Sequence, residues 1–577
     1  MRTLMRLDQD IAMPMRDGTL LRADIARPDD NARHAAIFWR GYRSSLERVP
    51  LQEYVDAGYA FVSQVIRGKG TSDGTWKLEE TFNVEGPDGY DSIEWISSQP
   101  WCDGSVGMMG YSHAAAFTYH AAAQNPPHLK AIAPRSGDFN LMFVPPRTGG
   151  AISLITLLIW MPNEAADVVN RFEKAGRDVT EMRRALDWAR DHPEEFYSYL
   201  PFKDVPFSRF ERMSEMLKTR LSPIPQPQLE RVRRYGKITV PSFHETGWYD
   251  GCGWTQFENF NNLQQRGGTP VARQGQHIII GPWEHSLEQK SALGDFHWGA
   301  SASGAGARLN QQHIAFFDRY VRGMEVAVPR VRYFVMGANQ WRNADAWPLA
   351  NTEWRRFYLH SRGNANSASG DGVLDREEPG HEAPDRFVYD PHHPVPTVGG
   401  GLIGAVEGIG IMPGPFDQSR IERRADVLCY TTPELKEDVE LTGPLQMHLF
   451  ASTSACDTDF TAKLIHVYPD GAAYNLAEGI LRASGRKFGE TPGQVTPGEV
   501  NEYVITIGNT SQAFRKGSRI RVDISSSNFP QFDRNMNTGN PIGADARGVV
   551  ALQTIYHEPG CASYIDLPVI AEKGIVY

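Results

Sequence analysis

Apolar runs and amphipathic stretches alternate along the first 138 residues. Residues 35–39 form a continuous apolar run and residues 59–65 a mostly apolar one, both typical of buried strands, and residues 90–97 have the pattern of a helix. An Ala-rich stretch after residue 113 predicts another helix, and residues 130–134 predict the strand that follows it. Such alternation indicates a parallel sheet with helices on both faces.

The alternation stops at residue 139 and resumes near residue 237. Between them lie an apolar block at 151–161 and charged amphipathic stretches such as 178–191, with few strand signals. We therefore predict a helical insertion that covers a site on the sheet. Apolar runs at 238–243 and 277–280 then predict two further strands of the same sheet.

The pattern changes again from about residue 353. Short alternating runs at 355–359, 438–441, 446–450 and 519–524 are separated by Gly, Pro, Asn and Asp. Several such strands at short intervals indicate an antiparallel sandwich or jelly roll. We predict an α/β catalytic domain (1–138 and 237–350), a helical cap (139–236) and a C-terminal β jelly roll (351–577).

Composition narrows the class of protein. The 577 residues are 41 % hydrophobic and 11 % aromatic, as in globular proteins, and exceed the size of one core. The net charge of −10 argues against nucleic acid or an anionic membrane as a partner. No signal peptide is recognisable, and the apolar block at 151–161 is too short to span a bilayer. The five cysteines include no C-x-x-C pair, so we predict reduced thiols and a cytoplasmic location.

Candidate chemistry begins with a serine at the apex of a predicted strand–turn–helix. Ser112 lies in MGYSHAA, between the apolar run 105–108 and the Ala-rich helix. Such an elbow exposes a nucleophilic hydroxyl, which needs an acid and then a histidine further along the chain. Asp250 and His285 each follow a predicted strand, in the order used by α/β-hydrolases. Taken singly, each residue is more often a turn or structural residue, and Asp before Gly is a common turn pair.

Several longer motifs resemble one family of acyl hydrolases. The chain is similar, almost end to end, to the family of bacterial cocaine esterase, glutaryl-cephalosporin acylases, α-amino-acid ester hydrolases and X-prolyl dipeptidyl peptidases. The motifs are MRDGTL at 15–20, QPWCDG at 99–104, YDP at 389–391, PVPTVGG at 394–400 and SSSNFP at 525–530. This resemblance implies an α/β-hydrolase domain with an inserted helical cap and a C-terminal jelly roll.

The resemblance also implies an oxyanion hole. The tyrosine hydroxyl of the family corresponds to Tyr42, and the backbone amide to that of His113, where relatives often have tyrosine. Without the family, Tyr42 would be interpreted as an exposed loop aromatic. Two donors aimed at the developing oxyanion are what acyl transfer requires.

The acyl group is expected to be apolar or aromatic and to lack a free amine. α-Amino-acid ester hydrolases carry a Glu-Asp pair just after the catalytic Asp, where this chain has Cys252 and Gly253. The segment leading into the cap, 139–150, contains no acid, and a buried ammonium without a counter-charge is unfavourable. Four tryptophans are candidates for the acyl pocket, although core packing is common for each: Trp160, Trp248, Trp254 and Trp283.

No metal or other cofactor is predicted. His392 and His393 are adjacent with no third ligand, and the segment beginning at Asp533 lacks the Gly and Glu of a calcium loop. We predict a serine hydrolase that cleaves small-molecule carboxylic esters through an acyl-enzyme. An amidase or acylase, a biosynthetic acyl transferase and a catalytically silent carbohydrate-binding relative remain alternatives, and a homo-oligomer is left open.

Overall fold

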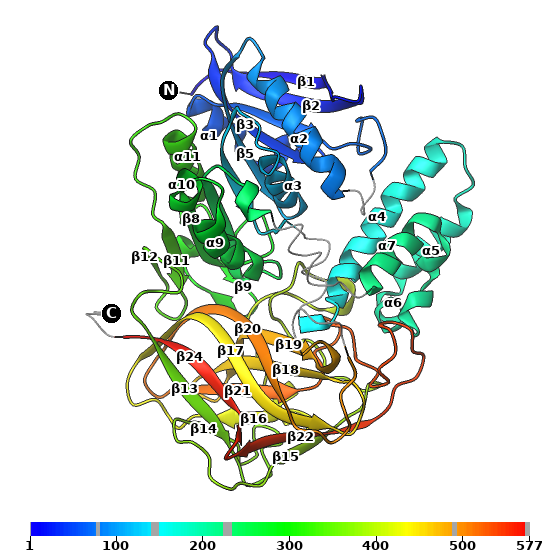
Figure 1. Ribbon diagram of the computed structural model, residues 1–577, viewed down its shortest axis with the longest axis vertical. Helices are drawn as coiled ribbons and strands as arrows, with labels where there is room; N and C mark the ends of the chain where they lie inside the picture. Colours follow the sequence, from blue (N-terminus) through cyan, green and yellow to red (C-terminus); the bar gives the residue numbers. More distant parts are fainter. Residues whose placement is uncertain (1, 77–80, 140–148, 223–233, 487–492, 572–577) are drawn as a thin grey trace.

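The computed structural model describes residues 2–76, 81–139, 149–222, 234–486 and 493–571. The N-terminal part is built on a ten-stranded sheet with the order β1-β2-β4-β3-β5-β6-β7-β8-β11-β12 (Figure 1). The pairs from β4 to β11 are parallel, and β1, β2 and β12 add antiparallel edges. The strands are β1 (Met5–Pro14), β2 (Leu20–Pro28), β3 (His34–Gly41), β4 (Ala60–Val65), β5 (Cys102–Tyr111), β6 (Leu129–Arg135), β7 (Ser242–Tyr249), β8 (Gln276–Glu284), β11 (Val331–Val335) and β12 (Gln340–Ala344).

Both faces of this sheet are buried. Alternate side chains of its strands pack in two different apolar clusters, one on each face. Ile37 of β3 packs in one apolar cluster, while its neighbours Ala36 and Phe38 pack in the other. Phe61 and Val62 of β4 divide in the same way. The predicted parallel sheet with helices on both faces is therefore confirmed. The helices are α1 (Leu51–Asp56), α2 (Thr81–Ser97), α3 (His113–Ala122), α9 (Trp254–Arg266), α10 (Pro270–Gln274) and α11 (Leu309–Tyr320).

A group of helices is inserted between β6 and β7. It contains α4 (Leu154–Lys174), α5 (Thr180–Asp191), α6 (Pro193–Ser198) and α7 (Glu211–Leu221), which Figure 1 shows beside the sheet domain. Leu157, Met161 and Ala165 lie on the buried face of α4 and join the core of the sheet domain. The helices thus form a cap attached through apolar contacts.

The C-terminal part is rich in β-structure. Its strands pair mostly antiparallel around a separate core that includes Leu441, Met447, Ile505 and Ile565. The main strands are β13 (Thr352–His360), β15 (Asp385–Tyr389), β16 (Leu428–Thr431), β17 (Val439–Thr453), β18 (Asp459–Val467), β19 (Ala473–Arg482), β20 (Asn501–Phe514), β21 (Arg519–Ser525), β22 (Ala551–Glu558) and β24 (Tyr564–Ile570), with the short β14 (Val373–Asp375) and β23 (Cys561–Ala562). The fold is an α/β-hydrolase domain with an inserted helical cap and a β-rich C-terminal domain. The exact domain boundaries given above stay predictions.

Two elements differ in extent from the sequence-based expectation. The helix expected at 90–97 begins at Thr81 and continues through Gly86 and Pro87. The strand expected at 238–243 begins only at Ser242 and continues to Tyr249. The apolar pattern did not predict the end of this strand, because it contains the polar residues His244 and Glu245. Their side chains can be buried there because each bonds to a partner far away in the sequence.

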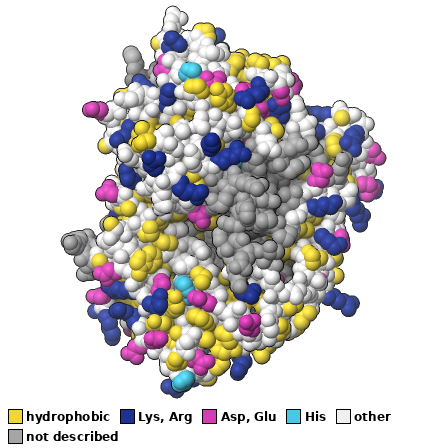
Figure 2. Space-filling view, viewed as in Figure 1, with side chains coloured by type: hydrophobic (Ala, Val, Ile, Leu, Met, Phe, Trp, Pro, Cys, Tyr) yellow, Lys and Arg dark blue, Asp and Glu magenta, His cyan; other side chains and the backbone are white. Residues whose placement is uncertain are grey.

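Among the described residues, no helix combines the length and apolar character needed to cross a bilayer. On the face shown in Figure 2, basic and acidic side chains are interspersed.

Candidate active site

Ser112 lies at the sharp turn between β5 and α3. Its backbone has φ 57° and ψ −121°, a conformation rarely adopted by residues other than glycine. The turn is possible because residue 110 is glycine: a Cβ there would lie 2.2 Å from the Ala114 carbonyl oxygen. The Ser112 amide donates to the Arg135 carbonyl at 2.9 Å, which fixes the turn to β6.

Asp250 and His285 follow the ends of β7 and β8, and the parallel sheet brings them to Ser112. His285 Nε2 lies 2.9 Å from Ser112 Oγ, and His285 Nδ1 lies 2.9 Å from Asp250 Oδ1. The Asp250 side chain is fully buried and that of His285 is 8 % exposed. The three predicted residues therefore form one continuous hydrogen-bonded chain with the geometry of nucleophile, base and orienting acid.

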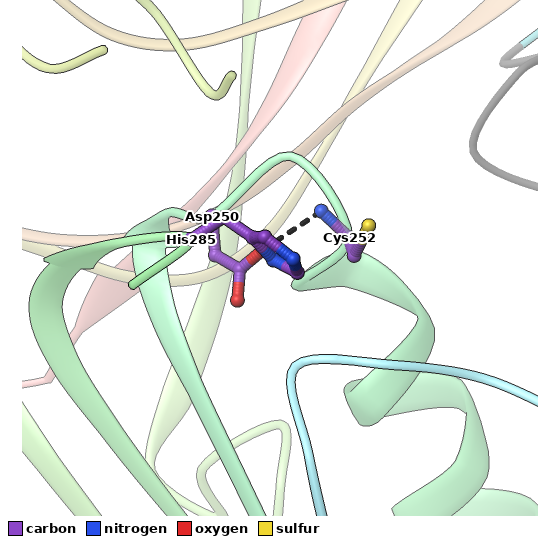
Figure 3. Close-up of side chains that lie close together, drawn as sticks. All are labelled: Asp250, Cys252 and His285. Atoms are coloured by element: carbon purple, nitrogen blue, oxygen red, sulfur yellow. Dashed lines mark hydrogen bonds and ion pairs between the residues drawn. The ribbon is translucent and has the colours of Figure 1, made fainter. Parts of the chain in front are cut away.

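Cys252 lies beside Asp250 and His285 (Figure 3). Its backbone amide donates to Asp250 Oδ1 at 2.8 Å, and potential ligand atoms of Asp250, Cys252 and His285 lie within 4.8 Å of one another. Burial, together with the charge of Asp250, raises the pKa of the Cys252 thiol well above its usual range. The Asp250 and His285 atoms that could bind a metal already hydrogen-bond to each other. This arrangement favours an acid–base pair over a metal site.

Buried polar contacts hold the loops that carry these residues. Glu245 of β7 accepts hydrogen bonds from Arg135 Nη2 at 2.8 Å and from Gln289 Nε2 at 2.7 Å. Gln289 also donates to the carbonyl of Ser286, the residue after His285. Glu245 thus connects the end of β6 to the loop of the base. No sequence pattern indicated this contact of Glu245.

Tyr42 and His113, the two residues expected to form the oxyanion hole, are in contact with each other. Tyr42 Oη is 2.5 Å from Nδ1 of the His113 ring. Burial raises the pKa of Tyr42 well above its usual range, so its hydroxyl keeps the proton that an oxyanion would need. Burial also lowers the pKa of His113 to about 3, which keeps its ring neutral.

Aromatic side chains surround this pair. Trp76 lies 5.4 Å from the Tyr42 ring, Phe117 lies 4.9 Å from the His113 ring, and Trp160 of α4 lies 6.3 Å from the His113 ring, all between centroids. Trp160 is one of the four tryptophans that the sequence analysis named as candidates for the acyl pocket. Trp76 and Phe117 were missed, because no sequence pattern links residues in separate loops and helices.

The other three candidate tryptophans occupy different positions. Trp248 stacks on Phe257 and donates its indole N–H to the Phe334 carbonyl. Trp283 donates to the Ala302 carbonyl and packs against Trp341. Trp254 begins α9 and is half-buried. Because Trp248 and Trp283 are satisfied within the core, we do not include them in the pocket.

Comparison with known proteins identifies the family. Residues 17–287 match the model of the X-Pro dipeptidyl-peptidase (S15) family, and residues 325–566 match that of the X-Pro dipeptidyl-peptidase C-terminal non-catalytic domain. Cocaine esterase of Rhodococcus sp. (strain MB1 Bresler) is 34 % identical over 607 aligned residues, covering 97 % of this chain and 98 % of the relative. The chain belongs to the cocaine esterase family of S15-type hydrolases. It is a serine ester hydrolase.

Solved structures of more distant relatives share the fold of this serine ester hydrolase. An aminopeptidase from a marine-sediment Thaumarchaeota archaeon superposes with a TM-score of 0.75 at 23 % identity, covering 99 % of this chain and 97 % of the other. An α-amino-acid ester hydrolase superposes with a TM-score of 0.72 at 22 % identity, covering 98 % and 96 %. At this level of identity the likeness extends to the fold alone.

Proposed function

We propose that this esterase cleaves carboxylic esters through an acyl-enzyme on Ser112. His285 takes the hydroxyl proton as the oxygen attacks the ester carbonyl, and then returns it to the leaving alcohol. Asp250 holds the imidazole in the correct tautomer and stabilises its cation. Water, activated by the same histidine, then releases the acid. The unbroken contacts from Ser112 through His285 to Asp250 carry this proposal.

The acyl group that suits this site is apolar or aromatic and has no free amine. The rings of Tyr42, Trp76, Phe117 and Trp160 around His113 support this inference. Residues 140–148, most of the segment whose lack of acids suggested the same selectivity, lie outside the described residues. A panel of p-nitrophenyl esters with acetyl, butyryl, benzoyl and phenylacetyl groups tests the proposal. A clear preference for acetyl would contradict it.

Tyr42→Phe is expected to lower kcat by roughly 10²-fold with little change in KM. The hydroxyl serves the oxyanion, which exists only in the transition state, so ground-state binding changes little. Steady-state kinetics on one aryl ester measure both constants. Tyr59→Phe is a suitable control, since its hydroxyl bonds to Asp318 on α11. Equal kcat for Tyr42→Phe and the parent enzyme would exclude the hydroxyl as a donor.

Activity should decline at acid pH, because protonated His285 cannot accept the proton of Ser112. His113 contributes little to this decline, because burial lowers its pKa to about 3, below the range of the assay. The pH dependence of kcat/KM between about pH 4 and 9 tests this expectation. A flat profile down to about pH 4 would argue against His285 as the base.

An amidase or acylase with the same triad is the nearest alternative, because ester and amide cleavage share these groups. Matched aryl esters and anilides, assayed side by side, distinguish the two. Faster anilide turnover would favour the amidase. An acyl transferase would instead show an added alcohol or amine outcompeting water.

A further inference from the structure

Lys69 is a buried cation at the junction between the sheet domain and the cap. It lies in the loop after β4 and is 4 % exposed. Its Nζ is 3.1 Å from Glu164 Oε2 and 2.7 Å from Asp167 Oδ2, both on cap helix α4. A buried ammonium requires such partners, so the two carboxylates provide the counter-charge.

Two aromatic rings complete the surroundings of this ammonium. Lys69 Nζ lies 5.0 Å from the centroid of the Tyr42 ring and 4.6 Å from that of Trp76. Ring faces attract cations at these distances, most strongly where water is excluded. Two carboxylates and two ring faces are the groups that recognise an alkylammonium ion.

The backbone of the loop makes this arrangement possible. Gly68 has φ +66°, and a Cβ there would lie 2.3 Å from the Trp76 amide nitrogen, so only glycine lets the chain fold back upon itself. This return brings Trp76 next to Lys69.

A further cation lies near one of the two carboxylates. Arg171 Nε is 3.2 Å from Asp167 Oδ2. Asp167 keeps 37 % of its side chain exposed, which leaves a side open to solvent. Glu164 is buried, and Lys69 Nζ lies within 3.1 Å of its Oε2.

We propose that Glu164, Asp167, Tyr42 and Trp76 form a cation-binding cage for small alkylammonium ions, and that Lys69 occupies it from within the chain. The Tyr42 and Trp76 rings also lie against the His113 ring, with centroids 5.1 Å and 6.4 Å away. This inference rests on the proposed function. Because Lys69 already fills the cage, acyl groups that carry a cation are excluded, and Lys69 determines this selectivity.

Chemical rescue tests the cage without any measurement of catalysis. Lys69→Ala empties the cage, removes the ammonium partner of Glu164 and leaves Asp167 paired with Arg171, so its Tm should fall. Ethylammonium or propylammonium chloride should restore Tm in a saturable manner, beyond the effect of NaCl at equal ionic strength. The parent enzyme and Lys290→Ala, which removes an exposed pair with Glu288, should show no such rise.

A control variant and a second measurement show whether rescue depends on the empty cage. Lys69→Met fills the cage with an uncharged side chain and should not respond to alkylammonium. If Lys69→Ala does not stay folded alone, its refolding yield with ethylammonium against NaCl is the readout. An absence of saturable rescue in both Tm and refolding yield would overturn the cage.

Selectivity is tested with matched p-nitrophenyl esters of phenylacetic acid and α-aminophenylacetic acid. The kcat/KM for the α-aminophenylacetyl ester divided by that for the phenylacetyl ester should be at least tenfold higher in Lys69→Ala than in the parent enzyme. Rescue with an unchanged ratio would overturn the selectivity role of Lys69. A failure of the proposed function would appear elsewhere, as ester turnover by the parent enzyme that does not depend on Ser112.

Discussion

Ser112→Ala is expected to abolish ester turnover and covalent labelling by a fluorophosphonate. The hydroxyl is the only group in the proposed mechanism that bonds to the acyl carbon, and loss of such a nucleophile in a comparable triad costs roughly 10⁶ in kcat. Aryl-ester kinetics and labelling with a fluorescent fluorophosphonate provide the two measurements. The remaining activity reports only on the oxyanion donors and on binding.

A matched control separates this chemical effect from a change in the backbone. Ser367, in a loop of the C-terminal domain, also has a positive φ, of 68°. Ser367→Ala introduces the same side chain at another serine with positive φ, in the C-terminal domain, and should keep full activity. Near-normal turnover or labelling in Ser112→Ala would mean that another residue is the nucleophile.

Asp250→Asn is expected to lower kcat by about 10⁴-fold with little change in KM, as in serine proteases with the same substitution. Asp250 Oδ1 faces His285 Nδ1 and also accepts the amide of Cys252. An asparagine can present its NH₂ group to the imidazole, which then keeps its proton on Nε2 and cannot accept one from Ser112. Kinetics at several pH values measure the loss.

The surface pair of Asp390 and His393 is the control for this substitution. It has a similar Asp–His contact, 2.8 Å between Oδ2 and Nδ1, in the C-terminal domain. Asp390→Asn should leave turnover unchanged. A loss of less than tenfold in Asp250→Asn would remove Asp250 from the mechanism, even if Ser112 proved essential.

Local patterns in the sequence were sufficient to predict the elements that they encode. Apolar runs marked β3, β4, β5 and β8 because those strands are buried on both faces. The ends of parallel strands meet at one edge of the sheet, so Ser112, Asp250 and His285 could be proposed from strand order alone. Their separation along the chain did not matter once the sheet was predicted.

Tertiary structure alone decided which distant side chains share a site. The extent of β7 depends on buried polar residues whose partners lie far along the chain, such as Glu245 and its partner Arg135. The seating of Lys69 between Tyr42, Trp76 and helix α4 likewise follows from the docking of the cap. Hydrophobic periodicity reports burial but not the identity of the partner. The charges and rings around the pocket therefore became apparent only when the domains were assembled.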